Sequence, residues 1–216
     1  MWSMFKPKRA KLEAWIRPHS VIAEQFRAIR ENIGFTAHNQ SLNSIAITSP
    51  QSGEGKSLIA ANLAVSMSRQ GQRVLLVDAH FKSPMIHTLF SLSNAVGLAD
   101  VLRGAIGWEE ATQQSELAGI DILTAGSLIG GSNEWLYPQA FRGWLSMTTD
   151  LYDVVLVDCP PIIDCADTQI IAYQVDGVIL TLRRGVSDLA RAEEAKNRLT
   201  LSKANILGVI FNDKDN

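Results

Sequence analysis

The sequence predicts a single doubly wound α/β domain built on a mostly parallel sheet. Three observations lead to this fold class: short apolar segments alternate with helical ones, the apolar segments are continuous rather than alternating in polarity, and no internal repeat or second core is visible. Continuously apolar strands are typical of parallel sheets because helices cover both of their faces. A chain of 216 residues is long enough to bury one complete core.

Segments rich in branched aliphatic residues are the expected strands. They are residues 44–49, 74–79, 120–123, 154–158, 177–182 and 206–212. The patterns between them predict helices, most clearly at residues 57–69, 134–147 and 187–201. Nearer the start of the chain, Ile22, Phe26, Ile29 and Ile33 recur at helical spacing and predict a helix that packs inward along this stripe.

Composition and charge exclude several classes of protein. Hydrophobic residues make up 46% and charged residues 19% of the chain, which excludes an intrinsically disordered protein. The net charge of -2 gives no basic excess, so nothing favours nucleic acid as a partner. No apolar run approaches the ~18–20 residues that a membrane helix needs. Cys159 and Cys165 cannot form a disulfide framework, and they favour a reduced, cytoplasmic protein.

Residues 1–18 are expected to form a basic N-terminal tail before a domain at residues 19–216. The tail contains Lys6, Lys8, Arg9, Lys11 and Arg17, with Glu13 as its one acidic residue. No apolar core follows this basic start, so a signal peptide is not indicated. A mobile tail is the simplest interpretation. The alternative is a weak contact with a membrane surface or a partner through Trp2, Phe5 and Trp15.

The strongest chemical signal is the sequence Thr-Ser-Pro-Gln-Ser-Gly-Glu-Gly-Lys-Ser at residues 48–57. A strand, a glycine-containing loop and a helix in this order predict a P-loop, whose backbone N–H groups bind phosphate at a helix N-terminus. Lys56 is expected to reach the β- and γ-phosphates, and the Ser57 hydroxyl to ligate Mg²⁺. Pro50 stands where the usual motif has its first glycine. The expected phosphate-binding residues are Ser52, Gly53, Glu54, Gly55, Lys56, Ser57 and Leu58.

Two of the apolar strands end in a carboxylate, Asp78 after VLLV and Asp158 after VVLV. Ligands of open α/β sheets bind beyond the carboxyl ends of the strands, so both side chains are expected near the phosphates. A carboxylate in that place can hold Mg²⁺ directly or through water. Either aspartate alone could be a helix cap or a turn residue. Beside a P-loop, Ser57, Asp78 and Asp158 together predict a magnesium site.

In combination these motifs resemble the cytoplasmic kinase domain of bacterial tyrosine kinases, which are P-loop proteins of the deviant Walker A lineage that control capsule and exopolysaccharide synthesis. The P-loop is similar to that family's, with Ser-Pro leading into Gly-Glu-Gly-Lys. The segment Asp78–Pro84 resembles the family's second aspartate signature, and Tyr152–Pro161 resembles its Walker B segment. Asp167 falls where the family has a further aspartate. The resemblance extends from about residue 17 to about residue 213.

The resemblance implies a protein-tyrosine kinase that uses ATP and Mg²⁺ and phosphorylates tyrosines of protein substrates. Asp78 is then the candidate base or water-orienting group. Asn212 and Arg183, which end the last two strands, are expected to face the nucleotide, although Asn212 could equally be a turn residue. The implied catalytic residues are Lys56, Asp78, His80 and Asp158.

The resemblance also implies partners. The pattern Glu24-x-x-Arg27-x-x-Arg30 matches a signature associated with assembly into a ring-like homo-oligomer. From the residues alone, the alternative is a solvated helix face with an i,i+3 charge pair. The family's activator is a membrane-embedded protein that regulates chain length. We therefore expect a cytoplasmic chain that a partner recruits to the inner face of the membrane.

The chain departs from the family pattern in two places. His80 stands where the second signature has another acidic residue, and a neutral imidazole brings no negative charge to a cation. No tyrosine follows Tyr173, whereas family members usually end in a tyrosine-rich tail. Weakened catalysis, an active enzyme adapted to His80, and an ATP-dependent regulatory or assembly module (a pseudokinase) all fit these departures. A ParA/MinD-like positioning ATPase fits less well, because Gln51 stands where those proteins have a signature lysine.

Overall fold

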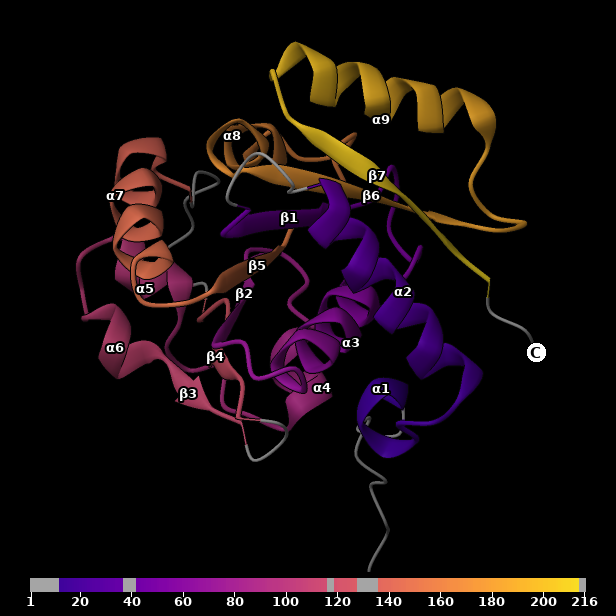
Figure 1. The fold of residues 1–216 in the computed structure, drawn as a ribbon. Helices are drawn as coiled ribbons and strands as arrows, with labels where there is room; N and C mark the ends of the chain where they lie inside the picture. The colour runs from indigo at the N-terminus through magenta and orange to yellow at the C-terminus, as the bar shows by residue number, and fades with distance from the viewer. Residues whose placement is uncertain (1–11, 37–41, 116–118, 128–135, 214–216) are drawn as a thin grey trace, which may run out of the picture.

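The computed structural model describes residues 12–36, 42–115, 119–127 and 136–213, and these residues form a sheet covered by helices on both faces (Figure 1). The sheet has seven strands in the order β3-β4-β2-β5-β1-β6-β7. The strands are β1 Ser44–Thr48, β2 Val74–Asp78, β3 Gln113–Gln114, β4 Asp121–Leu123, β5 Val154–Asp158, β6 Gly177–Arg183 and β7 Ile206–Asn212. All neighbouring strands are parallel except β3 and β4. The predicted fold class is therefore confirmed.

The helices divide into two groups that cover opposite faces of the sheet. One group is α1 Glu13–Ile16, α2 Val21–Thr36, α3 Lys56–Ser68 and α4 Ile86–Phe90. The other is α5 Leu98–Leu102, α6 Trp108–Ala111, α7 Pro138–Thr149, α8 Asp167–Gln174 and α9 Leu189–Leu201. The short elements α4, α5, α6 and β3 have no clear sequence pattern and were not expected.

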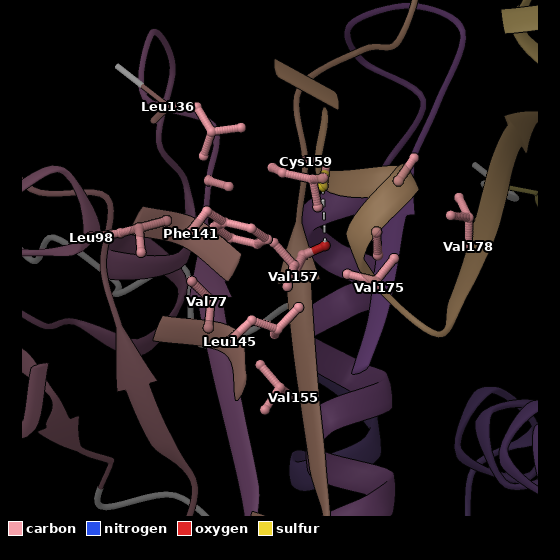
Figure 2. Close-up of a cluster of buried hydrophobic side chains, with 14 of the residues drawn as sticks. Val77, Leu98, Leu136, Phe141, Leu145, Val155, Val157, Cys159, Val175 and Val178 are labelled. Atoms are coloured by element: carbon pink, nitrogen blue, oxygen red, sulfur yellow. Dashed lines mark hydrogen bonds between the residues drawn. The ribbon is translucent and has the colours of Figure 1, made fainter. Parts of the chain in front are cut away.

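Successive residues of the central strands pack into two separate cores, because side chains alternate between the two faces of a sheet. In β5, Val155 and Val157 face the helices α5 to α9, whereas Val154 and Leu156 face α1 to α4. Figure 2 shows the first core, in which Phe141 of α7 lies among aliphatic side chains from the sheet and the neighbouring helices. Burial on both faces explains why these strands are continuously apolar in sequence.

The strands are observed within one residue of their expected bounds, whereas the helices differ more. The helix expected at residues 134–147 begins at Pro138, and residues 134 and 135 lie outside the described part of the chain. In α2, Phe26 and Ile33 are buried as expected, but Ile22 is 44% exposed and does not complete the inward stripe. No helix in the described ranges is long and apolar enough to cross a bilayer.

The expected N-terminal tail packs on the domain from Leu12 onward, so the boundary expected after residue 18 is not where packing begins. Leu12 is fully buried, and the backbone N–H of Ala14 donates to Asn62 Oδ1 of α3 at 3.0 Å. The guanidinium of Arg69 lies over the Trp15 ring, 5.2 Å from its centroid. Apolar burial and this cation–π contact oppose mobility here. Trp2, Phe5 and the other residues before Leu12 lie outside the described residues.

Candidate active site

The loop between β1 and α3 has the backbone of a phosphate-binding loop. Gly53 and Gly55 have φ angles of +84° and +93°, a conformation that only glycine adopts without strain. Lys56 and Ser57 then open the 13-residue helix α3, and both side chains are largely buried. A helix N-terminus carries partial positive charge and free N–H groups. The expected P-loop geometry is therefore present where the sequence placed it.

The carboxyl ends of β2 and β5 meet beside this loop, as predicted. The two strands pair in register, with Asp78 opposite Asp158, and β1 pairs with β5 on its other side. The P-loop follows β1 directly, so both aspartates lie at the same edge of the sheet as the loop. The parallel topology thus brings together two aspartates that are 80 residues apart in the sequence.

Asp158 is a buried carboxylate that accepts no hydrogen bond of regular geometry from the described part of the chain. Its side chain is fully buried. Burial raises the pKa of Asp158 to about 7, while the Lys56 ammonium and the nearby Ser57 hydroxyl lower it. A buried anion is costly unless an opposite charge compensates it. A cation held between Asp158 and Ser57 would supply that compensation, so the residues present fit Mg²⁺.

Asp78 is equally buried, but both of its carboxylate oxygens are occupied. Oδ1 accepts the backbone N–H of His80 at 3.0 Å, and Oδ2 accepts those of Met85 and Ile86 at 2.9 and 3.0 Å. Burial raises the pKa of Asp78, and these N–H groups lower it. The carboxylate therefore fixes the loop between β2 and α4, and it presents less free acceptor capacity to a metal than Asp158 does.

His80 contacts the P-loop lysine. Lys56 Nζ lies 3.2 Å from His80 Nδ1, and because an ammonium can only donate, Nδ1 must accept and Nε2 carries the ring proton. Burial lowers the pKa of His80 to about 4, and the charge of Lys56 acts in the same direction. The imidazole is therefore neutral near pH 7. In this structure His80 orients Lys56 rather than adding charge to the site.

Arg183 and Asn212 contact the backbone of the P-loop. Arg183 Nη1 donates to the Gly53 carbonyl at 3.2 Å, and Asn212 Nδ2 donates to the Glu54 carbonyl at 2.9 Å. Both side chains thus contact loop carbonyls, and that they face the nucleotide stays a prediction. The Glu54 side chain is fully buried and contacts Ser187, a residue for which the sequence offered no motif.

The remaining expected residues lie in the P-loop, in α3 and at the start of α8. Ser52 is exposed, Leu58 is half-buried in α3, and Asp167 begins α8. The sequence reading missed Thr48 and Thr168, whose hydroxyls each donate to the Pro160 carbonyl at 2.8 Å. They fix the segment after Asp158. Thr48 ends β1 and Thr168 lies in the first turn of α8, and a single threonine in either place is too common a feature to have indicated this contact.

The charged residues of α2 do not share one free face. Glu24 and Arg27 form an exposed pair at 3.7 Å. Arg30 is 11% exposed, and its Nη1 donates to the backbone carbonyl of Ser66 in α3 at 2.8 Å. Arg30 therefore docks α2 against α3 within the chain, and this intramolecular role was not anticipated.

The tyrosines differ in exposure. Tyr137, the N-cap residue of α7, and Tyr173 in α8 are 47% and 57% exposed. Tyr152 precedes β5, and its hydroxyl donates to Asp121 Oδ2 at 2.8 Å. Burial and this carboxylate raise the pKa of Tyr152. Tyr137 and Tyr173 are thus accessible, whereas Tyr152 is held in a structural contact.

Known proteins similar to the chain share both its sequence and its fold. Residues 45–216 match the family described as the CobQ/CobB/MinD/ParA nucleotide binding domain. The chain is 39% identical to the tyrosine-protein kinase YwqD of Bacillus subtilis (strain 168), over 93% of this chain and 85% of YwqD. It is 29% identical to the putative tyrosine-protein kinase CapB of Staphylococcus aureus, over 91% and 86%. The kinase domain of Escherichia coli tyrosine kinase ETK superposes with a TM-score of 0.90 at 28% identity, over 95% and 81%.

Proposed function

The chain belongs to the CobQ/CobB/MinD/ParA nucleotide-binding family and, within it, to the bacterial tyrosine-protein kinases, and on this premise we propose that it transfers the γ-phosphate of ATP to protein tyrosines in the control of capsule or exopolysaccharide synthesis. The observation that carries the proposal is the unpartnered, buried carboxylate of Asp158 beside the P-loop lysine and serine. A metal ion bound together with the nucleotide would supply the missing countercharge.

The residues divide the work by their contacts. Lys56 and the N–H groups of the P-loop would hold the β- and γ-phosphates, and Ser57 and Asp158 would hold Mg²⁺. When bound, the ion would supply positive charge next to the transferred phosphoryl group. Asp78 keeps the loop after β2 in place by accepting the backbone N–H groups of three of its residues. Phosphoryl transfer depends mainly on such positioning and on electrostatic stabilisation.

We propose that His80 weakens catalysis at this site. The imidazole contributes no negative charge at a position where the bacterial tyrosine kinase pattern has an acidic residue. The neutral ring also accepts a hydrogen bond from the Lys56 ammonium, and this bond competes with the contact between Lys56 and the phosphates. The test is the His80→Asp variant, assayed for ATP turnover. A gain in turnover is expected. Full activity in the parent together with no gain in the variant would defeat the weakened site and favour an enzyme adapted to His80.

The second candidate function is an ATP-dependent regulatory or assembly module. It is favoured by the contact between His80 and Lys56. With a histidine in place of a second acidic residue, the site could bind a nucleotide without transferring its phosphate efficiently. In that case ATP would change the size of the assembly in solution and leave every tyrosine unmodified.

The proposed partners follow from the family and from the exposed surface. We propose a membrane-embedded activator that recruits the chain to the cytoplasmic face of the membrane, and assembly into a homo-oligomer through the face that carries Glu24 and Arg27. Arg30 would contribute indirectly, by fixing α2 on α3. Tyr137 and Tyr173 are the tyrosines of the described region with enough exposure to act as acceptors.

The experiment that tests the proposal is incubation with Mg-ATP, with and without a candidate activator segment, followed by mass spectrometry of every tyrosine. Phosphotyrosine on the chain or on an added polysaccharide enzyme is expected, and it should disappear in the Lys56→Ala variant. Unmodified tyrosines with every activator, combined with an ATP-dependent shift in size, would replace the kinase with the regulatory module.

A further inference from the structure

Three side chains, two at the ends of β6 and β7 and one in the turn after β6, contact the P-loop on the side of β1 that faces away from β5 and Asp158. They are Arg183, Ser187 and Asn212, and we term them the outer clamp. Arg183 and Asn212 donate to the carbonyls of Gly53 and Glu54, and the Ser187 hydroxyl donates to Glu54 Oε1. Each contact fixes the loop without requiring the clamp to touch a nucleotide.

The carbonyl contacts determine which way the loop N–H groups point. In a planar trans peptide the C=O and the following N–H point in opposite directions, and the described residues have no cis peptide bond. Because the carbonyls of Gly53 and Glu54 point toward the outer clamp, the N–H groups of Glu54 and Gly55 point away from it. Successive N–H groups on one side of a loop form an anion-binding concavity.

The Glu54 side chain also holds the loop, through hydrogen bonds that its carboxylate accepts. An anionic group buried in a phosphate-binding loop is unfavourable unless hydrogen bonds hold it. Glu54 Oε2 accepts the backbone N–H of Gln51 at 2.8 Å, and Oε1 accepts the Ser187 hydroxyl. Ser187 Oγ in turn accepts the backbone N–H of Arg183 at 2.7 Å. This chain of hydrogen bonds connects the turn after β6 with both ends of the Gln51–Glu54 turn.

We propose that Ser187 is a positioning residue for nucleotide binding: by holding the Glu54 carboxylate, it keeps the P-loop in the conformation that accepts a polyphosphate. The role rests on the proposed function only in that the P-loop binds a nucleotide. Without the Ser187 hydroxyl, Glu54 Oε1 loses its partner inside the loop. The carboxylate then turns toward water, or toward the phosphates that it repels, and nucleotide affinity falls.

The test is the dissociation constant for Mg-ADP, measured by isothermal titration calorimetry on the whole chain. The Ser187→Ala variant should bind about tenfold more weakly, the effect of losing one hydrogen bond to a charged group. Ser187→Thr keeps a hydroxyl and should restore binding. The matched control is Ser202→Ala, which removes a hydroxyl bonded to the Arg198 carbonyl at the far end of α9. It should bind like the parent.

A second readout separates positioning from a general effect on stability. Ser187→Ala should lower the thermal midpoint of the nucleotide-free chain only slightly, because one hydrogen bond to a buried carboxylate is lost, and it should speed hydrogen exchange most in residues 51–58. Raising the ATP concentration should recover most of the lost turnover, so that KM changes more than kcat. Equal affinity in Ser187→Ala and the parent, or equal weakening in Ser187→Ala and Ser202→Ala, would overturn the role of Ser187.

The outcomes also distinguish this inference from the proposed function. A parent chain that binds Mg-ADP but phosphorylates no tyrosine, with weaker binding in Ser187→Ala, would remove the kinase and leave the positioning role intact. A parent chain that phosphorylates tyrosine, with unchanged binding in Ser187→Ala, would leave the kinase intact and remove the positioning role.

Discussion

Asp78 and Asp158 look the same in the sequence and differ in the structure. Each is the last residue of a buried five-residue strand whose other four residues are valine or leucine. The two strands pair in register, so the aspartates lie opposite one another. Yet Asp78 accepts three backbone N–H groups, whereas Asp158 accepts none from the described residues. A strand-end carboxylate can thus serve either the loop that follows it or a ligand, and its hydrogen-bond partners decide which.

The Asp158→Asn variant tests this contrast with the largest expected effect. It removes the unpartnered charge, so phosphoryl transfer should fall on the order of 100-fold, because the site loses its free metal-binding carboxylate. Stability without nucleotide should not fall, since Asp158 has no hydrogen bond of regular geometry with the described residues and its buried charge is removed. Turnover and thermal unfolding measure the two effects. A variant that retains parental turnover would remove Asp158 from the metal site.

The Asp78→Asn variant should show the opposite balance. An amide offers one acceptor oxygen to three N–H donors, so the free energy of unfolding should fall by about 1–3 kcal/mol. Urea unfolding measures this change. Unchanged stability combined with a loss of turnover as large as that of Asp158→Asn would show that Asp78 is itself a metal ligand, and the contrast would fail.

The two arginines of α2 extend the contrast to the helix surface. Arg30 donates to the Ser66 carbonyl of α3, whereas Arg27 is 61% exposed. Arg30→Ala should lower the free energy of unfolding by about 1–2 kcal/mol, and Arg27→Ala should change it by less than about 0.5 kcal/mol. Size measurement in solution checks assembly in parallel. Loss of assembly in Arg27→Ala without loss of stability would place that residue in a subunit contact.

The tyrosines give the smallest expected effect. Tyr152→Phe removes the hydroxyl bonded to Asp121 and should cost about 1 kcal/mol of stability, whereas Tyr173→Phe, at an exposed position, should cost close to nothing. In phosphorylated samples, Tyr173 and Tyr137 should carry phosphate in preference to Tyr152. Phosphate on Tyr152 in a folded chain would mean that its contact with Asp121 opens readily.

The sequence predicted the parts of the fold that depend on burial and on parallel topology. Continuous apolar strands and the P-loop pattern were enough to place Lys56, Ser57, Asp78 and Asp158 at one edge of the sheet. The pattern of hydrogen bonds could not be predicted, because it depends on where later segments return. Met85 and Ile86 reach Asp78 only because the chain turns into α4 there.

The same reason explains why the outer clamp was missed in part. The family resemblance implied that Arg183 and Asn212 face the nucleotide, but it did not predict their contacts with the loop carbonyls. Ser187 lies 133 residues from Glu54, and no local pattern marks it. At the N-terminus, the basic composition suggested a tail. The burial of Leu12 could not be predicted from that composition, because it depends on how α3 and its neighbours pack.

The measurement that tests the central claim most directly is the affinity for ADP with and without Mg²⁺, determined for the parent, Asp158→Asn and Asp78→Asn. If Asp158 is the free carboxylate that receives the ion, Mg²⁺ should strengthen ADP binding in the parent and in Asp78→Asn, and should have little effect in Asp158→Asn. A gain from Mg²⁺ in Asp158→Asn as large as in the parent would contradict the account.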